Sequence, residues 1–285
     1  MAKHLITDDT AKGVCAQLGL VFETRVGEGS FKQVFKVKDA AGQPFALKLT
    51  DPAVYSDRSE REIAVLSACT HPSIARLFGN GMVTGSTGGT IHYSIEEFLS
   101  GGTLSSKLLI SRFSAAQGRR LGISLVEALA YLDSLQRRCV HRDIKPDNVM
   151  FREPGDVPVL VDFGIARILA EVSLTQSWLP SGPGTPYYAS PEQLNNQKVL
   201  IDWRSDQFSL GITLSVACFG VHPFQEAGEP FGAIGAVQRV ARRDACARQF
   251  VDLCGNNGLD VLVRMVQPWP NHRFRFHADL LGALQ

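Results

Sequence analysis

Polar side chains are concentrated in one short stretch, His141 to Asn148, which reads His-Arg-Asp-Ile-Lys-Pro-Asp-Asn. A further acidic residue, Asp162, directly follows the apolar run Val159-Leu160-Val161. Charged side chains are almost never fully buried without a partner, so this density needs either solvent or a ligand that neutralises it. Apolar residues precede both tracts, and a polar loop that leaves a hydrophobic scaffold is the usual layout of an active site. We therefore take these residues as the candidate chemical centre.

This polar stretch, followed by Asp162-Phe163-Gly164, resembles the catalytic loop and metal-binding motif of eukaryotic-type Ser/Thr protein kinases. Phosphoryl transfer needs alignment of the nucleophile and cancellation of charge on the phosphates. Asp143 can accept the proton of an incoming hydroxyl, and Lys145 can neutralise charge on the transferred group. Asn148 and Asp162 offer the oxygen donors that Mg²⁺ prefers. His141 alone could be proposed as a general base, but the resemblance gives it a packing role.

Two glycines lie between two strand-like stretches, in the sequence Gly27-Glu28-Gly29-Ser30. Glycines at this spacing permit a tight hairpin whose amides can approach phosphate oxygens, although most such pairs are simple turns. The resemblance matches Gly27, Glu28, Gly29 and Ser30 to the glycine-rich loop over the nucleotide phosphates. Lys32 stands where that loop has its third glycine, which removes backbone freedom and adds a positive charge near the nucleotide.

One lysine interrupts the apolar strand pattern Phe45-Ala46-Leu47-Lys48-Leu49. Taken alone, Lys48 could be an edge lysine that keeps its head group in water. The resemblance instead matches it to the lysine that bridges the α- and β-phosphates and pairs with a glutamate of the αC helix. A helix is expected from about Asp57 to Ala68. In it Glu62 matches that partner, and Glu60 belongs to the solvated face.

The same resemblance implies an adenine site. Val34, Ala46 and Met150 match the apolar positions on the two sides of the ring. The backbone from Glu97 to Leu99 matches the hinge that binds the base. Glu96 falls at the gatekeeper position, where an acidic residue is unusual for the family and makes the back of the adenine pocket polar.

Several hydroxyl side chains lie between Gly164 and Ser190, in a loop rich in Gly and Pro where most such groups are simply exposed. Ser181 precedes Thr185 by four residues and aligns with the common activation-loop phosphosite. The resemblance implies that Arg142 and Arg167 bind a phosphate there through charge-assisted hydrogen bonds. We therefore expect autophosphorylation of the activation loop at Ser181.

Other matches are structural or concern the substrate. Asp206 matches the residue that anchors the catalytic-loop backbone, and Arg273 is expected to pair with buried Glu192. Breaking such a pair costs roughly 3–5 kcal/mol, because it leaves one buried charge alone. Thr103 replaces an acidic residue that helps many kinases to select basic substrates, so a basic consensus is not supported.

The composition excludes several other classes of protein. The 285 residues include 29 Lys and Arg and 28 Asp and Glu, which gives a net charge of +1. This balance provides no electrostatic footprint for nucleic acid and no polybasic membrane patch. The six cysteines show no C-x-x-C pairing, so no zinc site is expected. No stretch approaches the roughly 20 apolar residues needed to span a bilayer. The N-terminus lacks the apolar core of a signal peptide, so we expect a cytoplasmic protein with free thiols.

These matches predict an α+β, bilobal protein-kinase-like fold. A five-stranded antiparallel sheet with the αC helix would occupy residues 20–97 and a mainly helical lobe residues 100–285, with ATP between the two lobes. Residues 1–19 would form an N-terminal extension with a short helix from Asp9 to Leu18. A leucine stripe within a helix expected over residues 114–136 is typical of a core. Its members are Leu121, Leu125, Leu129 and Leu132.

The predicted activity is ATP- and Mg²⁺-dependent phosphorylation of Ser and Thr in a protein substrate. A regulatory partner or a transient homodimer would serve autophosphorylation, and neither nucleic acid nor membrane is expected as a partner. The compact layout and the spelling GTPYYASPEQ suggest a bacterial or phage-related member.

Three alternatives stay open. A pseudokinase would keep the fold as a binding module; the missing third glycine and Glu96 favour it, while the complete set of catalytic matches opposes it. A small-molecule kinase of the antibiotic-phosphotransferase kind would share the catalytic Asp and Asn but not the segment from Gly184 to Glu192, which builds a platform for protein substrates. In with-no-lysine kinases, a lysine at the position of Lys32 replaces the strand lysine; both are present here, and we expect Lys48 to contact the phosphates.

Overall fold

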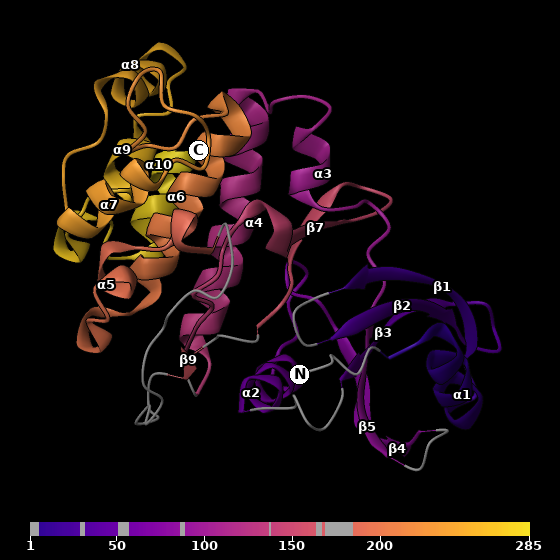
Figure 1. The fold of residues 1–285 in the computed structure, drawn as a ribbon. Coiled ribbons are helices and arrows are strands. Elements are labelled where there is room, and N and C mark those ends of the chain that lie inside the picture. The colour runs from indigo at the N-terminus through magenta and orange to yellow at the C-terminus, as the bar shows by residue number, and fades with distance from the viewer. Residues whose placement is uncertain are drawn as a thin grey trace. The chain divides into compact units, whose positions relative to one another are not determined.

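The computed structural model describes residues 6–28, 32–50, 57–85, 89–136, 138–163, 167–168 and 185–285 (Figure 1). The chain divides into two compact units. The first unit comprises Met1–Thr70 and Ala75–Ser100, and the second comprises His71–Ile74 and Gly101–Gln285. The short segment His71–Ile74 belongs to the second unit because Ser73 and Ile74 pair with Leu160, whose N–H donates to the Ser73 carbonyl at 2.9 Å.

A five-stranded antiparallel sheet forms the first unit, as predicted. Its strands follow the order β1-β2-β3-β5-β4 and have these bounds: β1 Val21–Glu28, β2 Gln33–Lys38, β3 Pro44–Thr50, β4 Leu77–Thr84 and β5 Thr90–Glu97. Buried and half-buried residues alternate along β2, which is the pattern of a strand with two different faces. The predicted glutamate-bearing helix is α2 (Asp57–Ser67), which ends one residue before its predicted limit.

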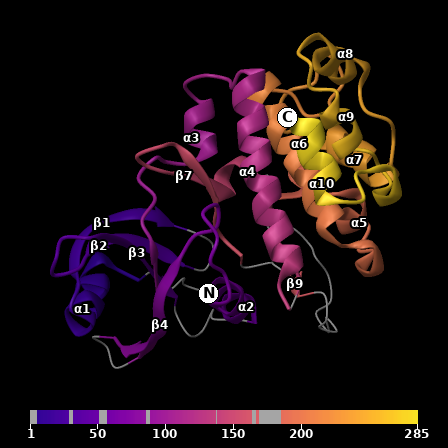
Figure 2. The same ribbon diagram turned by 180° about the vertical axis from the view of Figure 1, so that it is seen from behind.

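One face of this sheet packs against helix α1 (Asp8–Leu18), which Figures 1 and 2 show beside the strands. The helix begins one residue before the predicted start, because Thr7 caps it by accepting a hydrogen bond from the Thr10 amide at 3.2 Å. It ends at Gly19, whose left-handed φ of 68° suits a residue without a Cβ. The shared core consists of Ile6, Ala11, Val14, Cys15, Phe35, Val37, Leu47, Leu49 and Ile91. The opposite face of the sheet is thereby left to the polar residues described below.

Helices dominate the second unit. Its α-helices are α3 Leu104–Leu108, α4 Ala115–Ser134, α5 Pro191–Leu194, α6 Trp203–Phe219, α7 Ile234–Arg242, α8 Arg248–Asn256, α9 Val261–Met265 and α10 His277–Leu284. Single 3₁₀ turns span Pro146–Asn148, Thr185–Tyr188, Lys198–Leu200 and Pro270–His272. Its short strands are β6 Cys139–Val140, β7 Val149–Arg152, β8 Val157–Leu160 and β9 Arg167–Ile168, which pair as β6–β9 and β7–β8.

The core of the second unit lies between α4 and α6. All four leucines of the predicted α4 stripe are buried, and α6 is buried around nearly its whole circumference. Figure 2 shows α4 running beside α6 and α10, in agreement with the contacts between these helices. Within the described part of the chain, no helix has both the length and the apolar character needed to cross a membrane.

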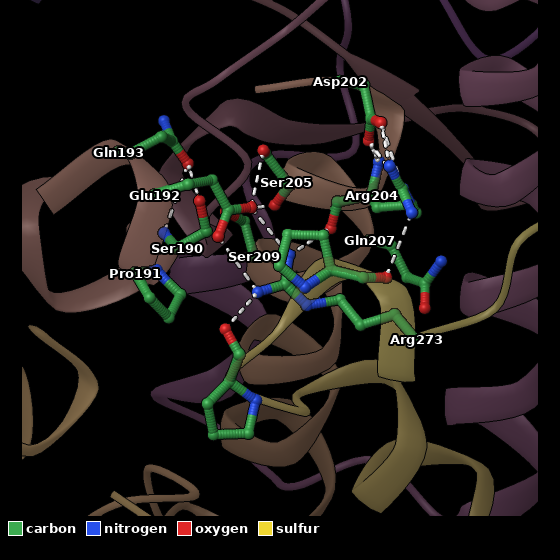
Figure 3. Close-up of polar contacts among 12 residues, drawn as sticks. Ser190, Pro191, Glu192, Gln193, Asp202, Arg204, Ser205, Gln207, Ser209 and Arg273 are labelled. Atoms are coloured by element: carbon green, nitrogen blue, oxygen red, sulfur yellow. Dashed lines mark hydrogen bonds and ion pairs between the residues drawn. The ribbon is translucent and has the colours of Figure 1, made fainter. Parts of the chain in front are cut away.

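A buried ion pair joins two segments of the second unit that lie 81 residues apart in the sequence (Figure 3). Arg273 Nη1 lies 2.7 Å from Glu192 Oε1, Nη2 lies 3.1 Å from Oε2, and both side chains are 0% exposed. Ser205 donates a hydrogen bond to the same Oε1 at 2.7 Å. Burial raises the pKa of Glu192, but the Arg273 charge and these hydrogen bonds outweigh it and leave the pKa below its usual value. The predicted pairing is confirmed.

Candidate active site

The backbone of the polar loop is anchored on helix α6 by Asp206, which is 1% exposed. Its carboxylate accepts hydrogen bonds from the amides of His141 and Arg142, each at 2.7 Å. The anchoring contact expected from the resemblance is therefore present. Burial raises the pKa of Asp206 to about 7, and the two amide hydrogen bonds offset this only in part.

Arg142 occupies the left-handed region with φ at 70°, a conformation that is costly for a residue with a side chain. Two hydrogen bonds hold its peptide units in place: its N–H donates to Asp206, and its carbonyl accepts from Gln193 Nε2 at 2.8 Å. Gln193 is 1% exposed at the start of α5, where it also forms a capping box with Ser190. Our sequence analysis missed Gln193, although Ser190-Pro191-Glu192-Gln193 carries the S-x-x-Q capping-box spacing that could have indicated it.

His141 supports the loop from inside. The Asp143 amide donates to its Nδ1 at 3.3 Å, so the ring proton lies on Nε2, which donates to the Val161 carbonyl at 3.2 Å. The ring packs on Phe163, with 4.6 Å between centroids. His141 is fully buried, and burial lowers its pKa. A neutral ring with both nitrogens engaged has a structural role, in line with the packing role that we expected.

Two candidate catalytic residues, Lys145 and Asn148, both contact a third, Asp143. Lys145 Nζ lies 2.9 Å from Asp143 Oδ2, and Asn148 Nδ2 donates to the same oxygen at 2.9 Å. Asn148 Nδ2 also donates to the Asp143 backbone carbonyl at 2.9 Å. These bonds use the amide hydrogens of Asn148 and leave its Oδ1 as the side-chain atom that can coordinate a cation. The arrangement fixes the orientation of the Asp143 carboxylate.

The two candidate metal ligands lie at one end of the β7–β8 hairpin. Val149 pairs with Leu160 in that hairpin, and the Val161 N–H donates to the Asn148 carbonyl at 3.0 Å. Asn148, just before β7, and Asp162, just after β8, therefore lie at the same end of the hairpin. Asp162 has a left-handed φ of 63°, a further strained position in the loop region. An amide oxygen and a carboxylate are hard oxygen donors, so this pair fits Mg²⁺.

In the first unit, Lys48 and Glu62 meet on the face of the sheet opposite α1. Lys48 Nζ lies 3.2 Å from Glu62 Oε1, and the glutamate is 5% exposed. The strand register explains which residues share this face. Val34 pairs with Lys48 and Lys48 with Ser94, while Ala46 pairs with Glu96, so all of these side chains point to the same side.

The same face holds two contacts that sequence reasoning did not find. Glu96 Oε2 lies 2.6 Å from Lys48 Nζ, and its Oε1 accepts a hydrogen bond from Ser94 at 2.9 Å. Lys32 forms an ion pair with the second oxygen of Glu62. Glu96 and Lys32 both depart from the family pattern, but the sequence alone does not connect them to Lys48 and Glu62.

The candidate adenine contacts divide between the two units. Val34 and Ala46 lie half-buried on the Lys48 face of the sheet, and Leu99 is buried. The N–H of Glu97 donates a hydrogen bond to the Arg76 carbonyl at 2.9 Å. The backbone group of Glu97 that could bind an adenine base is therefore its carbonyl, which would accept a hydrogen bond. Met150 in the second unit forms a bridge with Thr103.

Several predicted residues lie outside the described part of the chain. They are Gly29, Ser30 and Ser181, together with the side chains of Glu28 and Arg167. Gly27 is described at the end of β1, where it pairs with Val34 across the hairpin. The roles of these residues stay predictions.

Comparison with known proteins agrees with this fold and site. The sequence profile of the protein kinase domain matches residues 20–280, and the chain belongs to this family. It is 30% identical over 255 residues to "CBL-interacting protein kinase 17" of Oryza sativa subsp. japonica. This match covers 87% of the present chain and 52% of that protein. The chain is also 32% identical over 206 residues to "Serine/threonine-protein kinase dst1" of Dictyostelium discoideum, covering 70% of this chain and 26% of that protein.

A bacterial relative shows the same level of similarity. The chain is 30% identical over 210 residues to "Probable serine/threonine-protein kinase PknB" of Bifidobacterium longum, covering 70% of this chain and 30% of that protein. The chain thus spans about half or less of the length of these relatives. Because plants, an amoeba and a bacterium are represented alike, the similarity does not favour the bacterial origin that the sequence suggested.

Proposed function

We propose that this chain transfers the γ-phosphoryl group of ATP to Ser and Thr hydroxyls of protein substrates, with Mg²⁺ as the metal. The observation that carries the proposal is the contact cluster of Asp143, Lys145 and Asn148. A loop with a strained residue, clamped by Asp206 and Gln193, holds this cluster in one geometry. Such preorganisation is what phosphoryl transfer asks of a protein.

Each residue of the cluster has a distinct role in the proposal. Asp143 orients the substrate hydroxyl and accepts its proton, and Lys145 stabilises charge on the phosphoryl group in transfer. Asn148 and Asp162 would hold the metal, which when bound neutralises charge on the phosphate oxygens. Lys48, positioned by Glu62, binds the α- and β-phosphates.

The remaining nucleotide contacts follow from the family match. Gly27, Glu28, Gly29 and Ser30 would cover the phosphates with their backbone amides. The adenine ring would be bound by Val34, Ala46, Met150, the Glu97 carbonyl and the Leu99 backbone. The used N–H of Glu97 supports the choice of its carbonyl.

Regulation and substrate choice are further parts of the proposal. We propose autophosphorylation at Ser181 in a transient homodimer or with a regulatory partner, with Arg142 and Arg167 binding the new phosphate. Phosphopeptide mass spectrometry of active protein tests this, and an activation segment without phosphate would contradict it. All six cysteines are free thiols, which supports a reducing compartment such as the cytoplasm. The near-neutral charge gives no support for a nucleic-acid or membrane partner.

The test measures transfer of radiolabelled phosphate from ATP to a generic protein substrate in the presence of Mg²⁺. It compares the wild-type protein with the Asp143→Asn variant as the enzyme. Removal of the general base should lower the rate by about 10²- to 10⁴-fold. Asp162→Asn should likewise abolish most transfer, because it removes a metal ligand. Asp147→Asn is the matched control, since Asp147 lies in the same loop but is exposed and bonds only to Ser105 among the contacts described.

Two outcomes would contradict the proposal. Equal incorporation by wild type and Asp143→Asn would remove Asp143 from the chemistry. Magnesium-dependent binding of ATP without any transfer, with and without candidate activating partners, would instead favour the pseudokinase alternative.

A further inference from the structure

Four charged side chains alternate in sign along one face of the first unit's sheet. We call Lys32, Glu62, Lys48 and Glu96 the charge row. Lys32 contacts Glu62, Glu62 contacts Lys48 at 3.2 Å, and Lys48 contacts Glu96 at 2.6 Å. Lys48 therefore lies closer to Glu96 than to Glu62, the glutamate on helix α2.

Burial makes the balance of charge in this row important. Glu62 and Glu96 are 5% and 3% exposed, whereas the side chains of Lys48 and Lys32 are 14% and 23% exposed. Two buried carboxylates that shared one lysine would leave a net negative charge in a poorly solvated place, which is costly. Lys32 adds a second cation to the charge row through its pair with Glu62.

The orientation of Glu96 is itself fixed. Ser94 donates to Oε1 at 2.9 Å, which leaves Oε2 toward Lys48. Ala46 is the ladder partner of Glu96, and Val34 is the ladder partner of Lys48. The charge row therefore lies on the same face as two of the residues proposed to contact the nucleotide.

We propose that Lys32 and Glu96 are a compensating pair that sets nucleotide affinity through Lys48. Glu96 competes with the nucleotide phosphates for Lys48 and weakens binding; Lys32 pairs with Glu62, adds positive charge and strengthens binding. The inference rests on the proposed function, because it assumes that Lys48 binds phosphates. It assigns roles to both departures from the family pattern, the lysine at the third glycine position and the acidic gatekeeper.

The proposal makes signed predictions for three variants. Glu96→Gln keeps the size and the Ser94 contact but removes the charge, and should tighten binding of Mg·ADP by about five- to tenfold, the scale of one partly screened charge contact. Lys32→Met should weaken it by a similar factor. The double variant should bind close to the wild-type affinity, because the two effects cancel. Lys32→Arg, which keeps the charge, should restore most of the affinity that Lys32→Met loses.

Isothermal titration of each variant with Mg·ADP measures these affinities. Lys38→Met is the matched control: Lys38 ends strand β2, which begins directly after Lys32, its side chain is 40% exposed, and it pairs with Glu23, which is not part of the charge row. Equal affinity of Glu96→Gln and wild type would overturn the proposal. So would single variants that shift affinity in the same direction, or a double variant that shows the effect of only one.

A second measurement, without nucleotide, separates failure of this inference from failure of the proposed function. Lys32→Met should lower the thermal midpoint in the wild-type background but much less in the Glu96→Gln background, because Lys48 then faces one carboxylate of the charge row instead of two. Equal losses in both backgrounds would overturn the compensation. If wild-type protein bound no Mg·ADP, the proposed function and the affinity role would both fail, and the unfolding comparison would still decide whether the two residues compensate.

Discussion

The two compact units each contain a buried ion-pair system, and the two systems differ in construction. In the second unit, Glu192 and Arg273 are both 0% exposed and meet through two contacts, 2.7 and 3.1 Å long. The other N–H groups of Arg273 donate hydrogen bonds to the backbone carbonyls of Arg204, Gln267 and Pro268. In the first unit, the charge row contains two lysines, each partly accessible, and two carboxylates.

The difference lies in what a new ligand could displace. The planar guanidinium of Arg273 binds both carboxylate oxygens of Glu192 in a fixed geometry. A new ligand could therefore not replace one of these contacts without breaking the pair. A lysine is a compact charge on a flexible chain and can leave one oxygen for another. Lys48 already contacts two carboxylates. We infer that the Glu192–Arg273 pair serves stability and that the charge row serves ligand binding.

The largest expected effect comes from removing one partner of the Glu192–Arg273 pair, which we call the closed pair. Arg273→Met leaves Glu192 buried and unpaired, and should lower the free energy of unfolding by about 3–5 kcal/mol. Urea denaturation measures this loss. Arg248→Met is the control, because its pair with Asp252 on α8 is exposed, with side chains 91% and 56% accessible. That control should change stability by less than about 1 kcal/mol. Similar losses in both variants would remove the distinction between closed and accessible pairs.

A second prediction concerns Asp206, a buried carboxylate held by backbone amides instead of an arginine fork. Asp206→Asn can accept only one of the two amide hydrogen bonds, and the unsatisfied amide should cost about 1–3 kcal/mol. Asp252→Asn on exposed α8 should have little effect and is the control.

The pH dependence of the Asp206 effect has a definite sign. The folded-state pKa is raised to about 7, and an unfolded aspartate titrates near about 3.9. Between these values the folded chain holds more protons than the unfolded chain, so the contribution of Asp206 to stability falls as pH rises. The stability gap between wild type and Asp206→Asn should therefore narrow from pH 4 to pH 7. A gap that widened over this range would show that the carboxylate is ionised throughout.

The smallest effect compares two serines in matching positions. Ser205 donates to Glu192 in the closed pair at 2.7 Å, and Ser94 donates to Glu96 in the charge row at 2.9 Å. Ser94→Ala should cost about 1 kcal/mol and Ser205→Ala about 2 kcal/mol, because an unsatisfied acceptor costs more where no solvent or second cation can replace the donor. Chemical denaturation of both variants measures the difference. A larger loss in Ser94→Ala would reverse our view of which system is closed.

Much of the molecule could be predicted from local patterns in the sequence. The strand pattern of β3, the leucine stripe of α4 and the run of candidate catalytic residues each depend on neighbours a few positions away. The family match then supplied the pairing of Lys48 with Glu62 and the anchoring role of Asp206, because motif spacing carries both. The role of helix α1 in the core of the first unit was not predicted, since nothing in its own pattern says which surface it covers.

The sequence by itself determined the kinds of element, their order and the loop that carries the candidate catalytic residues, because these follow from periodicity and from contiguous motifs. Only the tertiary structure decided which oxygen each cation meets. Glu96 contacts Lys48 because the β3–β5 register puts both side chains on one face, and Lys32 contacts Glu62 because the hairpin and α2 bring them together. Gln193 supports Arg142 from 51 residues away, a distance along the chain that no local pattern spans.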